Sequence, residues 1–313
     1  MMLAFKTLPE LFAAMPTEQA AIDHFTAIRW GAGKFCPLCG NADAARIGTL
    51  TGTNTHKCYV CRKRFSIRVG TIFQDTKLPL RTWFAAIWLI TNHPKGIAST
   101  TLATDLGVTQ KTAWFVLHRL RHAARTPSFN GQLGDNGPVE ADETLVGGRE
   151  ENKHARKRLS AITGKPTGPR GGKTIVMGII ERGGELRAGV IEDTMADTVQ
   201  KIVRHHVSAP SLLMTDDANG YRGLAGDYVH QTICHSGGEY VRGIVHTNSI
   251  ESVWALLKRQ IIGIHHWVSP KHLDAYVQEM TFRFNRRDVP KGVRVNALLA
   301  QVEGPLPYKV LIA

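Results

Sequence analysis

The sequence predicts a mixed α/β protein in which a small cysteine-rich segment and a helical segment precede an α/β domain. Three observations support this prediction: paired cysteines near the N-terminus, apolar positions at helical spacing around residues 80–120, and alternating strand-like and helix-like runs after residue 138. With 313 residues, of which 43% are hydrophobic, the chain is long enough for two or three packed domains. We expect five consecutive parts, at residues 1–75, 76–126, 127–137, 138–290 and 291–313.

Four of the five cysteines form the pairs Cys36–Cys39 and Cys58–Cys61, and eighteen residues separate the pairs. This spacing is within the range of four-cysteine zinc sites, because each two-residue gap lets both thiolates of a pair meet one tetrahedral ion. We therefore predict a structural Zn²⁺ ribbon within residues 1–75. Disulfides are the alternative, and they are disfavoured because a cytosolic chain is kept reduced. The fifth cysteine, Cys234, is predicted to be a buried strand residue.

The helical segment, residues 76–126, is predicted to contain three helices. Aromatic and aliphatic residues recur at helical spacing over residues 80–91. Residues 99–106 form the next helix, Gly107 makes a tight turn, and Thr109 caps a basic helix that runs to about residue 121. This order is typical of a helix-turn-helix DNA-binding motif.

The last of these helices carries the candidate DNA contacts. Gln110 and Lys111 in its first turn would face base edges or phosphates, and Arg119 and Arg121 would lie nearer to the DNA backbone. The alternative is a plain three-helix linker domain in which the aromatic residues form the core.

Proline, asparagine and glycine cluster within residues 127–137, which we predict to be a flexible linker. The domain that follows has the order strand, strand, strand, helix, strand, helix, strand, helix, which is that of an RNase H-like α/β sheet. Its predicted strands are residues 138–144, 174–180, 185–191, 211–216 and 228–234, and its clearest helices are residues 198–207 and a helix that begins near residue 246.

A glycine-rich and basic insertion, residues 147–173, separates the first two of these strands. We predict a mobile loop whose basic residues, from Lys153 to Lys173, hold a DNA backbone. An ordinary solvated run of charge is the alternative.

Three acidic residues of this domain are candidate metal ligands. Asp142 lies in the first predicted strand, Asp216 closes the fourth, and Glu251 lies near the start of the last helix. Two strand-end carboxylates and one on a later helix can converge on Mg²⁺ or Mn²⁺, which prefer oxygen ligands. A pair of such ions can activate one oxygen and stabilise the leaving oxygen of a phosphodiester. The set therefore indicates phosphodiester chemistry.

The helix that carries Glu251 is amphipathic. Glu251 and Lys258 are two turns apart on the flank of its apolar stripe, where they suit a metal ion and a phosphate respectively. A loosely paired surface flank is the alternative. The apolar stripe consists of Ile250, Val253, Trp254, Leu257 and Ile261.

Each carboxylate also has a purely structural interpretation. Asp142 fits an ordinary strand-end aspartate, and Asp216 fits the start of a turn through residues 217–220. Glu251 follows Asn248 by three residues, as in a capping box. The order of two strand aspartates and one helical glutamate favours the metal interpretation.

The formal net charge of +13 argues for a polyanionic partner, because Lys and Arg release counterions from phosphates. An inert basic surface and an acidic membrane are the alternatives, and DNA is favoured by the motifs above. No run of about 18 apolar residues appears, and the N-terminal residues lack a signal-peptide pattern. We expect a cytoplasmic, nucleoid-associated protein that does not bind membranes.

Three motifs in combination resemble the ISXO-like DDE transposases of bacterial insertion sequences, over most of residues 25–290. The runs Ser269–Leu273 and Phe282–Arg287 also match the endings of that family. The three motifs are Val139-Glu140-Ala141-Asp142-Glu143-Thr144 with Gly147-Gly148, Thr215-Asp216-Asp217 with Gly220-Tyr221, and His246-Thr247-Asn248-Ser249-Ile250-Glu251-Ser252-Val253-Trp254 with Lys258-Arg259.

The resemblance implies an RNase H-like core that cleaves and joins DNA strands at element ends with divalent metal ions. By position, it implies Asp142, Asp216 and Glu251 as the metal-binding triad and Lys258 as a basic residue at the DNA.

Two rival ligands stay open. Some relatives carry asparagine as the third ligand, so Asn248 is a candidate substitute for Glu251. Asp217 is likewise a rival for Asp216.

The function expected from these observations is that of a DNA transposase, with element ends and target DNA as partners and a homodimer or larger assembly in the DNA complex. Residues 34–125 are expected to recognise the ends, and residues 138–290 to supply the chemistry. Two other classes fit less well: a zinc-ribbon and helix-turn-helix regulator without catalysis, and another metal-dependent nuclease such as a resolvase or a repair enzyme.

Overall fold

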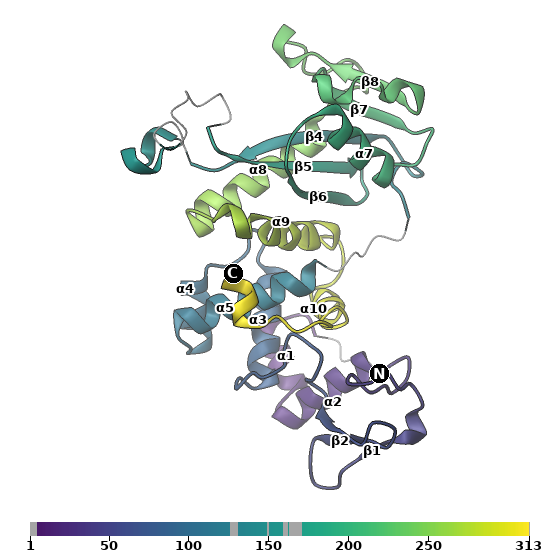
Figure 1. Cartoon of the computed structure of the whole chain (residues 1–313), viewed down its shortest axis with the longest axis vertical. Coiled ribbons are helices and arrows are strands. Elements are labelled where there is room, and N and C mark those ends of the chain that lie inside the picture. Colours follow the sequence, from purple (N-terminus) through teal and green to yellow (C-terminus); the bar gives the residue numbers. More distant parts are fainter. Residues whose placement is uncertain (1–4, 126–130, 149, 159–161, 163–170, 313) are drawn as a thin grey trace. The chain divides into compact units, whose positions relative to one another are not determined.

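The computed structural model describes residues 5–125, 131–148, 150–158, 162 and 171–312. Contacts divide the chain into two units (Figure 1). Unit 1 combines Met1–Thr126 with Arg286–Ala313, and unit 2 is Pro127–Asn285. Within the described parts of both units, no helix is long and apolar enough to span a bilayer.

Unit 1 begins with two helices and a small antiparallel sheet. Thr7 and Thr17 cap the helices by accepting bonds from backbone N–H groups three residues on. The side chains of Trp30, His56 and Phe65 pack against one another in edge-to-face and tilted contacts and form the small core of this sheet. The elements are α1 (Leu8–Ala14), α2 (Glu18–Arg29), β1 (Ile47–Thr49), β2 (Thr55–Cys58) and β3 (Arg64–Ser66), with strand order β1-β2-β3.

Three helices follow, α3 (Leu80–Asn92), α4 (Ser99–Leu106) and α5 (Gln110–Ala124). Gly107 ends α4 in the left-handed region with φ 63°, a conformation that glycine adopts without steric penalty. The Thr109 hydroxyl then accepts the N–H of Thr112 and caps α5. The predicted helix, turn and helix are therefore present at the predicted residues.

The C-terminal residues 286–313 belong to unit 1 rather than to a separate tail. α10 (Lys291–Leu299) packs against α3, α2 and α5, and Asn296 bonds to the buried His24 at 2.9 Å. The short helix α11 (Tyr308–Ile312) follows it. In residues 291–313, apolar residues do not recur at helical spacing over a stretch long enough to predict this packing.

Unit 2 is built on a five-stranded sheet with the order β6-β5-β4-β7-β8. β4, β5 and β6 form an antiparallel meander, whereas β7 and β8 run parallel to β4. This arrangement confirms the predicted RNase H-like α/β core. The elements are β4 (Val139–Val146), β5 (Thr174–Glu181), β6 (Leu186–Ile191), α7 (Ala196–His206), β7 (Leu212–Asp216), β8 (Val229–Ile233), α8 (Asn248–Gln260) and α9 (Pro270–Asn285).

The two faces of this sheet are covered by different helices (Figure 1). On one face, Val139 and Ala141 of β4 pack in a core with Val199 and Val203 of α7. A second core on the opposite face contains residues from α8 and α9 together with β5 and β6. Because side chains alternate along a strand, Glu140 and Asp142 lie on the face that α8 covers.

The structure departs from the predicted order between β7 and β8. Two 3₁₀ turns, Asn219–Tyr221 and Leu224–Gly226, replace the expected helix. Three glycines within eight residues disfavour a regular helix there. Residues 131–137, predicted as linker, instead join the sheet domain: Leu133 is buried in its core, and Glu181 accepts the N–H of Gly134.

Candidate active site and zinc centre

Asp142 lies in the middle of β4, the central strand of the sheet, and its side chain is largely buried. The indole N–H of Trp254 in α8 donates to Asp142 Oδ2 at 2.8 Å. This bond orients the Asp142 carboxylate through one of its two oxygens.

A glycine on β5 brings α8 close enough for this bond. Gly178 pairs with Asp142 across the sheet. A Cβ atom at Gly178 would lie 2.6 Å from the ring of Trp254 and 2.8 Å from Ile250, both closer than side chains tolerate. The missing side chain therefore lets the indole approach the sheet beside Asp142.

Asp216 is the last residue of β7 and lies on the same face of the sheet. β4 and β7 pair in parallel with Val139 opposite Leu213 and Glu140 opposite Met214. Continuing this register by two residues brings Asp142 opposite Asp216. The backbone N–H of Ala218 donates to Asp216 Oδ1 at 3.1 Å, so this carboxylate also begins a turn.

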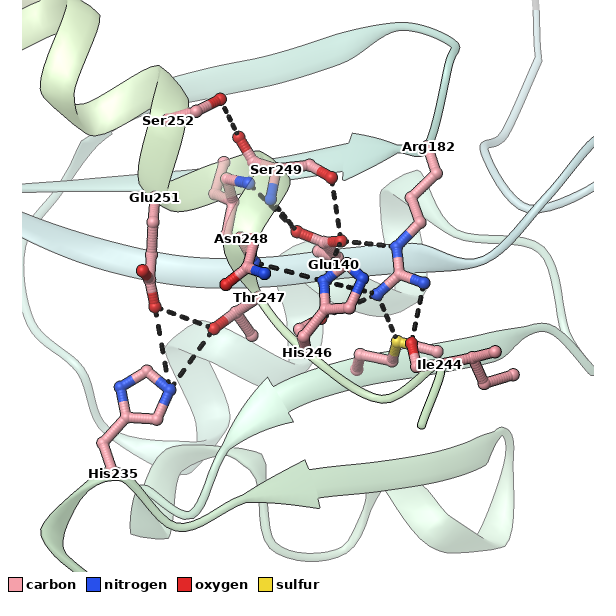
Figure 2. Close-up of polar contacts among 12 residues, drawn as sticks. Glu140, Arg182, His235, Ile244, His246, Thr247, Asn248, Ser249, Glu251 and Ser252 are labelled. Carbon is pink, nitrogen blue, oxygen red and sulfur yellow. Dashed lines mark hydrogen bonds and ion pairs between the residues drawn. The ribbon is translucent and has the colours of Figure 1, made fainter. Parts of the chain in front are cut away.

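Glu251 lies in the first turn of α8 (Figure 2). Its Oε1 accepts the hydroxyl of Thr247 at 3.1 Å and lies 3.7 Å from Nε2 of His235. Glu251 is one turn before Trp254, the residue that bonds to Asp142. The predicted apolar stripe of this helix is buried at all five positions, which confirms its orientation.

Glu140 of β4 does the capping that the sequence offered as an alternative role for Glu251. Thr247, rather than Asn248, is the N-cap residue of α8, and its side chain makes no cap bond. The backbone N–H groups of Ser249 and Ile250 bond instead to Glu140 of β4.

The environment of Asp142 disfavours its ionised form. Burial, together with the negative charges of Asp216 and Glu251, raises the pKa of Asp142 to about 6 against the lowering effect of the Trp254 hydrogen bond. Burial also raises the pKa of Asp216, and its neighbour Asp217 adds to this shift. Asp216 and Glu251 are therefore both close enough to Asp142 to disfavour its ionised form, which a bound cation would favour.

These residues suit a hard cation by chemistry, since all three offer carboxylate oxygens. Their oxygens are spread more widely than a single-ion site requires: in the described chain, only the four cysteines have ligand atoms all within 4.8 Å of one another. A pair of ions about 3.5–4 Å apart can be held by such a wider set of ligands.

The rival residues are placed less favourably. Asp217 is exposed beyond the end of β7, and it does not contribute to the pKa shift of Asp142. Asn248 is exposed at the start of α8, where its N–H donates to His246 Nδ1 at 3.4 Å.

Glu143 and His235 lie near these carboxylates, although neither was predicted as a site residue from the sequence. Glu143 accepts the buried hydroxyl of Tyr221 at 2.9 Å, and burial raises its pKa to about 7. His235, after β8, lies between Thr247 and Glu251. Gly220-Tyr221 and Glu143 belong to the motifs that resemble the transposase family, but nothing in the sequence indicates their pairing, and Cys234-His235 lies in no motif.

The zinc centre lies in unit 1. Sγ of Cys36 is 3.9 Å from that of Cys61, and Sγ of Cys39 is 3.8 Å from that of Cys58. A tetrahedral Zn²⁺ with Zn–S bonds of about 2.3 Å separates its sulfurs by about 3.8 Å, so the four thiols fit the ion. All four are free cysteines, which excludes the disulfide alternative in this structure. The four thiolates complete the shell without His56, whose Nδ1 bonds to Thr49.

Of the predicted DNA contacts on α5, those in its first turn are exposed. Gln110 and Lys111 are exposed, with Gln110 donating to Ser99 Oγ at 2.9 Å and Lys111 lying 5.3 Å from the ring centre of Tyr308. The basic residues around the second cysteine pair, Arg62, Lys63 and Arg64, are exposed as well.

Burial contradicts the prediction that Arg119 and Arg121 contact DNA. The side chain of Arg119 donates to the carbonyls of Ile72 and Gln74, at 2.8 and 3.0 Å, and stacks on the ring of Phe115. Arg121 is among the largest fully buried side chains of the protein. Because arginines are mostly exposed in proteins, the burial of Arg119 and Arg121 was not predictable from the sequence.

Lys258 is exposed on α8, two turns after Glu251. The basic insertion is described only in part: it contains short 3₁₀ turns at Glu150–Asn152 and Ala155–Lys157, whereas Lys165 and Arg170 lie outside the described residues. Cys234 follows the end of β8 and is half-buried rather than part of the strand.

Two segments of the chain match known protein families. Residues 135–285 match the family described as ISXO2-like transposase domain, and residues 16–64 match the transposase zinc-ribbon domain. The chain therefore carries an ISXO2-like transposase domain preceded by a transposase zinc-ribbon domain. A protein of Halobacterium salinarum, described as an uncharacterized protein in transposable element ISH50, is 27% identical over 274 residues, which are 85% of this chain and 90% of the relative.

The matched regions of this transposase coincide with the two sites. Asp142, Asp216 and Glu251 all lie within the transposase domain, and the four cysteines lie within the zinc-ribbon match. The match and the sulfur geometry together identify the cysteine cluster as a structural zinc site.

We predict about one zinc per chain, because four thiolates complete one tetrahedral shell. Cys39→Ser should lower the zinc content and make residues 16–64 sensitive to protease, since so short a segment needs the metal to fold. Cys234→Ser is the matched control and should retain full zinc. Elemental analysis and limited proteolysis test this, and a zinc-free but protease-resistant ribbon would contradict it.

The raised pKa of Asp142 predicts a pH-dependent stability in buffer without added divalent cations. Its folded-state pKa of about 6 exceeds the unfolded value of 3.8, so the native state holds the proton more tightly and the contribution of this group to stability is lost as pH rises between these values. Asp142→Asn removes the titration. The difference in unfolding free energy between wild type and this variant should shift against wild type by roughly 2–3 kcal/mol from pH 4 to 7.

Chemical denaturation at several pH values measures this difference, and added Mg²⁺ should reverse the loss at pH 7. If the difference in unfolding free energy between wild type and Asp142→Asn stays constant over this pH range, the pKa of Asp142 is not raised in the folded protein.

Proposed function

We propose that this transposase binds the ends of an insertion sequence, cleaves DNA strands there and transfers them to target DNA. The observation that supports it most is that, within the matched transposase domain, the charges of both Asp216 and Glu251 raise the pKa of Asp142. A purely structural aspartate would rarely be placed beside two other carboxylates.

We assign the divalent-metal site to these three carboxylates. Bound Mg²⁺ or Mn²⁺ ions would activate an attacking oxygen and stabilise the leaving oxygen of a phosphodiester. Trp254 orients the Asp142 carboxylate through its 2.8 Å hydrogen bond. Lys258, exposed on the same helix as Glu251, is suited to hold a DNA phosphate near the site.

A DNA-binding regulator without catalysis is the second candidate, and the exposed first turn of α5 suits that role equally well. It gives no reason for three half-buried or helix-borne carboxylates beside one another, which would repel DNA. A metal-dependent nuclease of another kind shares the carboxylates. Strand-transfer products, and inverted repeats that flank the coding region, separate a transposase from such a nuclease.

The central prediction concerns the triad. Asp142→Asn and Asp216→Asn should each lower cleavage of end-bearing DNA by about 100-fold or more in Mg²⁺, because each removes an ionic metal ligand. Both variants should still bind that DNA. Asp217→Asn is the matched control, because Asp217 is the exposed neighbour of Asp216, and it should cleave at close to the wild-type rate.

The third ligand is tested by a separate pair of variants. Glu251→Gln preserves the size of the side chain and an oxygen that accepts hydrogen bonds, but it removes the charge, so cleavage should be lost as in Asp142→Asn. Asn248→Ala should retain cleavage. The reverse pattern, active Glu251→Gln and inactive Asn248→Ala, would transfer the ligand role to Asn248.

Division of labour between the two units gives a further prediction, tested in the full chain. Gln110→Ala should reduce the preference for end DNA over scrambled DNA by about 1–3 kcal/mol if its amide reads a base. Lys258→Ala should weaken binding to both DNAs alike and lower the slope of the salt dependence by about one.

Binding titrations on both DNAs at several salt concentrations provide the measurement. An unchanged preference in Gln110→Ala, or an altered preference in Lys258→Ala, would refute this division.

A further inference from the structure

Glu140 is a fully buried carboxylate two residues before Asp142 on β4. Both side chains lie on the sheet face that α8 covers, because residues two apart on a strand share a face. A buried charge is strongly unfavourable unless it is paired and hydrogen-bonded. The partners of Glu140 therefore show what this residue holds together.

Both oxygens of Glu140 are directed at the start of α8 (Figure 2). Oε2 accepts the backbone N–H groups of Ser249 and Ile250, at 2.8 and 3.0 Å, and Oε1 accepts the Ser249 hydroxyl at 3.0 Å. A carboxylate at this end of a helix satisfies otherwise unpaired N–H groups and interacts favourably with the helix dipole. Glu140 thus caps α8 from a neighbouring strand.

Arg182 neutralises Glu140 and ties down the chain that leads into α8. Its Nε donates to Glu140 Oε1 at 2.5 Å. The same guanidinium donates to the carbonyl of Ile244 at 2.8 Å and to that of His246 at 2.9 Å. The helix start, the preceding segment and β4 are therefore joined through one ion pair.

This cluster is adjacent in sequence to two of the proposed metal ligands. Glu140 is two residues from Asp142, and the Ile250 N–H that it accepts belongs to the residue before Glu251. Since Glu140 satisfies the first-turn N–H groups, the Glu251 carboxylate is not used in capping its own helix. We infer that Glu140 is a positioning residue, which sets Glu251 at its working distance from Asp142 and so determines how tightly the triad binds divalent metal.

The inference rests on the proposed triad, and it competes with a simpler role in which Glu140 only stabilises the fold. Glu181 provides a matched control for that role. It is buried at the end of β5, and its Oε1 accepts the N–H groups of Gly134 and Asn136 at 2.9 and 3.0 Å. Glu181→Gln therefore removes a buried, N–H-bonded carboxylate from the same sheet without altering the start of α8.

The experiment measures Mn²⁺ binding by calorimetry on the zinc-loaded full chain, without DNA, for wild type, Glu140→Gln, Glu181→Gln and Asp142→Asn. Losing an outer-shell partner of a metal ligand commonly costs 10–100-fold in affinity. We expect Glu140→Gln to raise the Kd for Mn²⁺ by about 10-fold or more, and Glu181→Gln to stay within about twofold of wild type. Cleavage of pre-bound end DNA should need correspondingly more Mn²⁺ in Glu140→Gln.

The outcomes separate the two proposals. An equal Kd in Glu140→Gln and wild type, or an equal rise in both glutamine variants, overturns the positioning role. An Asp142→Asn protein that binds Mn²⁺ as wild type does would instead overturn the proposed triad. Should Glu140→Gln fail to fold, Ser249→Ala removes a single bond to Glu140, and a Kd identical to that of wild type would count against the inference in the same way.

Discussion

The packing of α8 against β4 and β5 is the contact on which the proposed site depends, because Glu251 belongs to the helix and Asp142 to the strand. Two hydrogen-bonded ties hold the helix in place. Glu140 accepts the N–H groups of its first turn, and the Trp254 indole donates to Asp142 one turn later. Gly178 makes the second tie possible, because any larger residue would push the indole off the sheet.

The two carboxylates of β4 that face α8, Glu140 and Asp142, have different electrostatic environments. Glu140 is buried with a guanidinium and a set of N–H donors, so its charge is compensated within the protein. Asp142 is largely buried with no charged donor among the groups that lower its pKa, which are the Trp254 indole and the backbone N–H of Glu143, and the charges of Asp216 and Glu251 raise its pKa. The two residues are neighbours on one strand face, yet one is fully satisfied and the other is left to find a positive partner. Such a contrast is what a cation site requires of its ligands and of the residues that orient them.

Strand and helix positions in unit 2 were largely predictable from the sequence, because alternation and helical spacing are local signals. The apolar stripe from Ile250 to Ile261 is buried as predicted, and the four cysteines meet as their spacing predicts. Features that depend on distant pairing were not predictable. The bond between Glu140 and α8 joins residues more than a hundred positions apart, and Arg119 is buried by partners near Ile72 and Leu306.

Locating the bound metal ions in a crystal is the most direct test of whether Asp142 and its two neighbouring carboxylates hold them. A crystal of the full chain soaked in Mn²⁺ and measured at the manganese absorption edge would place the ions without reference to activity. The account predicts anomalous peaks in contact with Asp142, shared between that residue and Asp216 or Glu251, and distinct from the zinc at the four cysteines. Manganese bound elsewhere, with no ion in contact with Asp142, would contradict it.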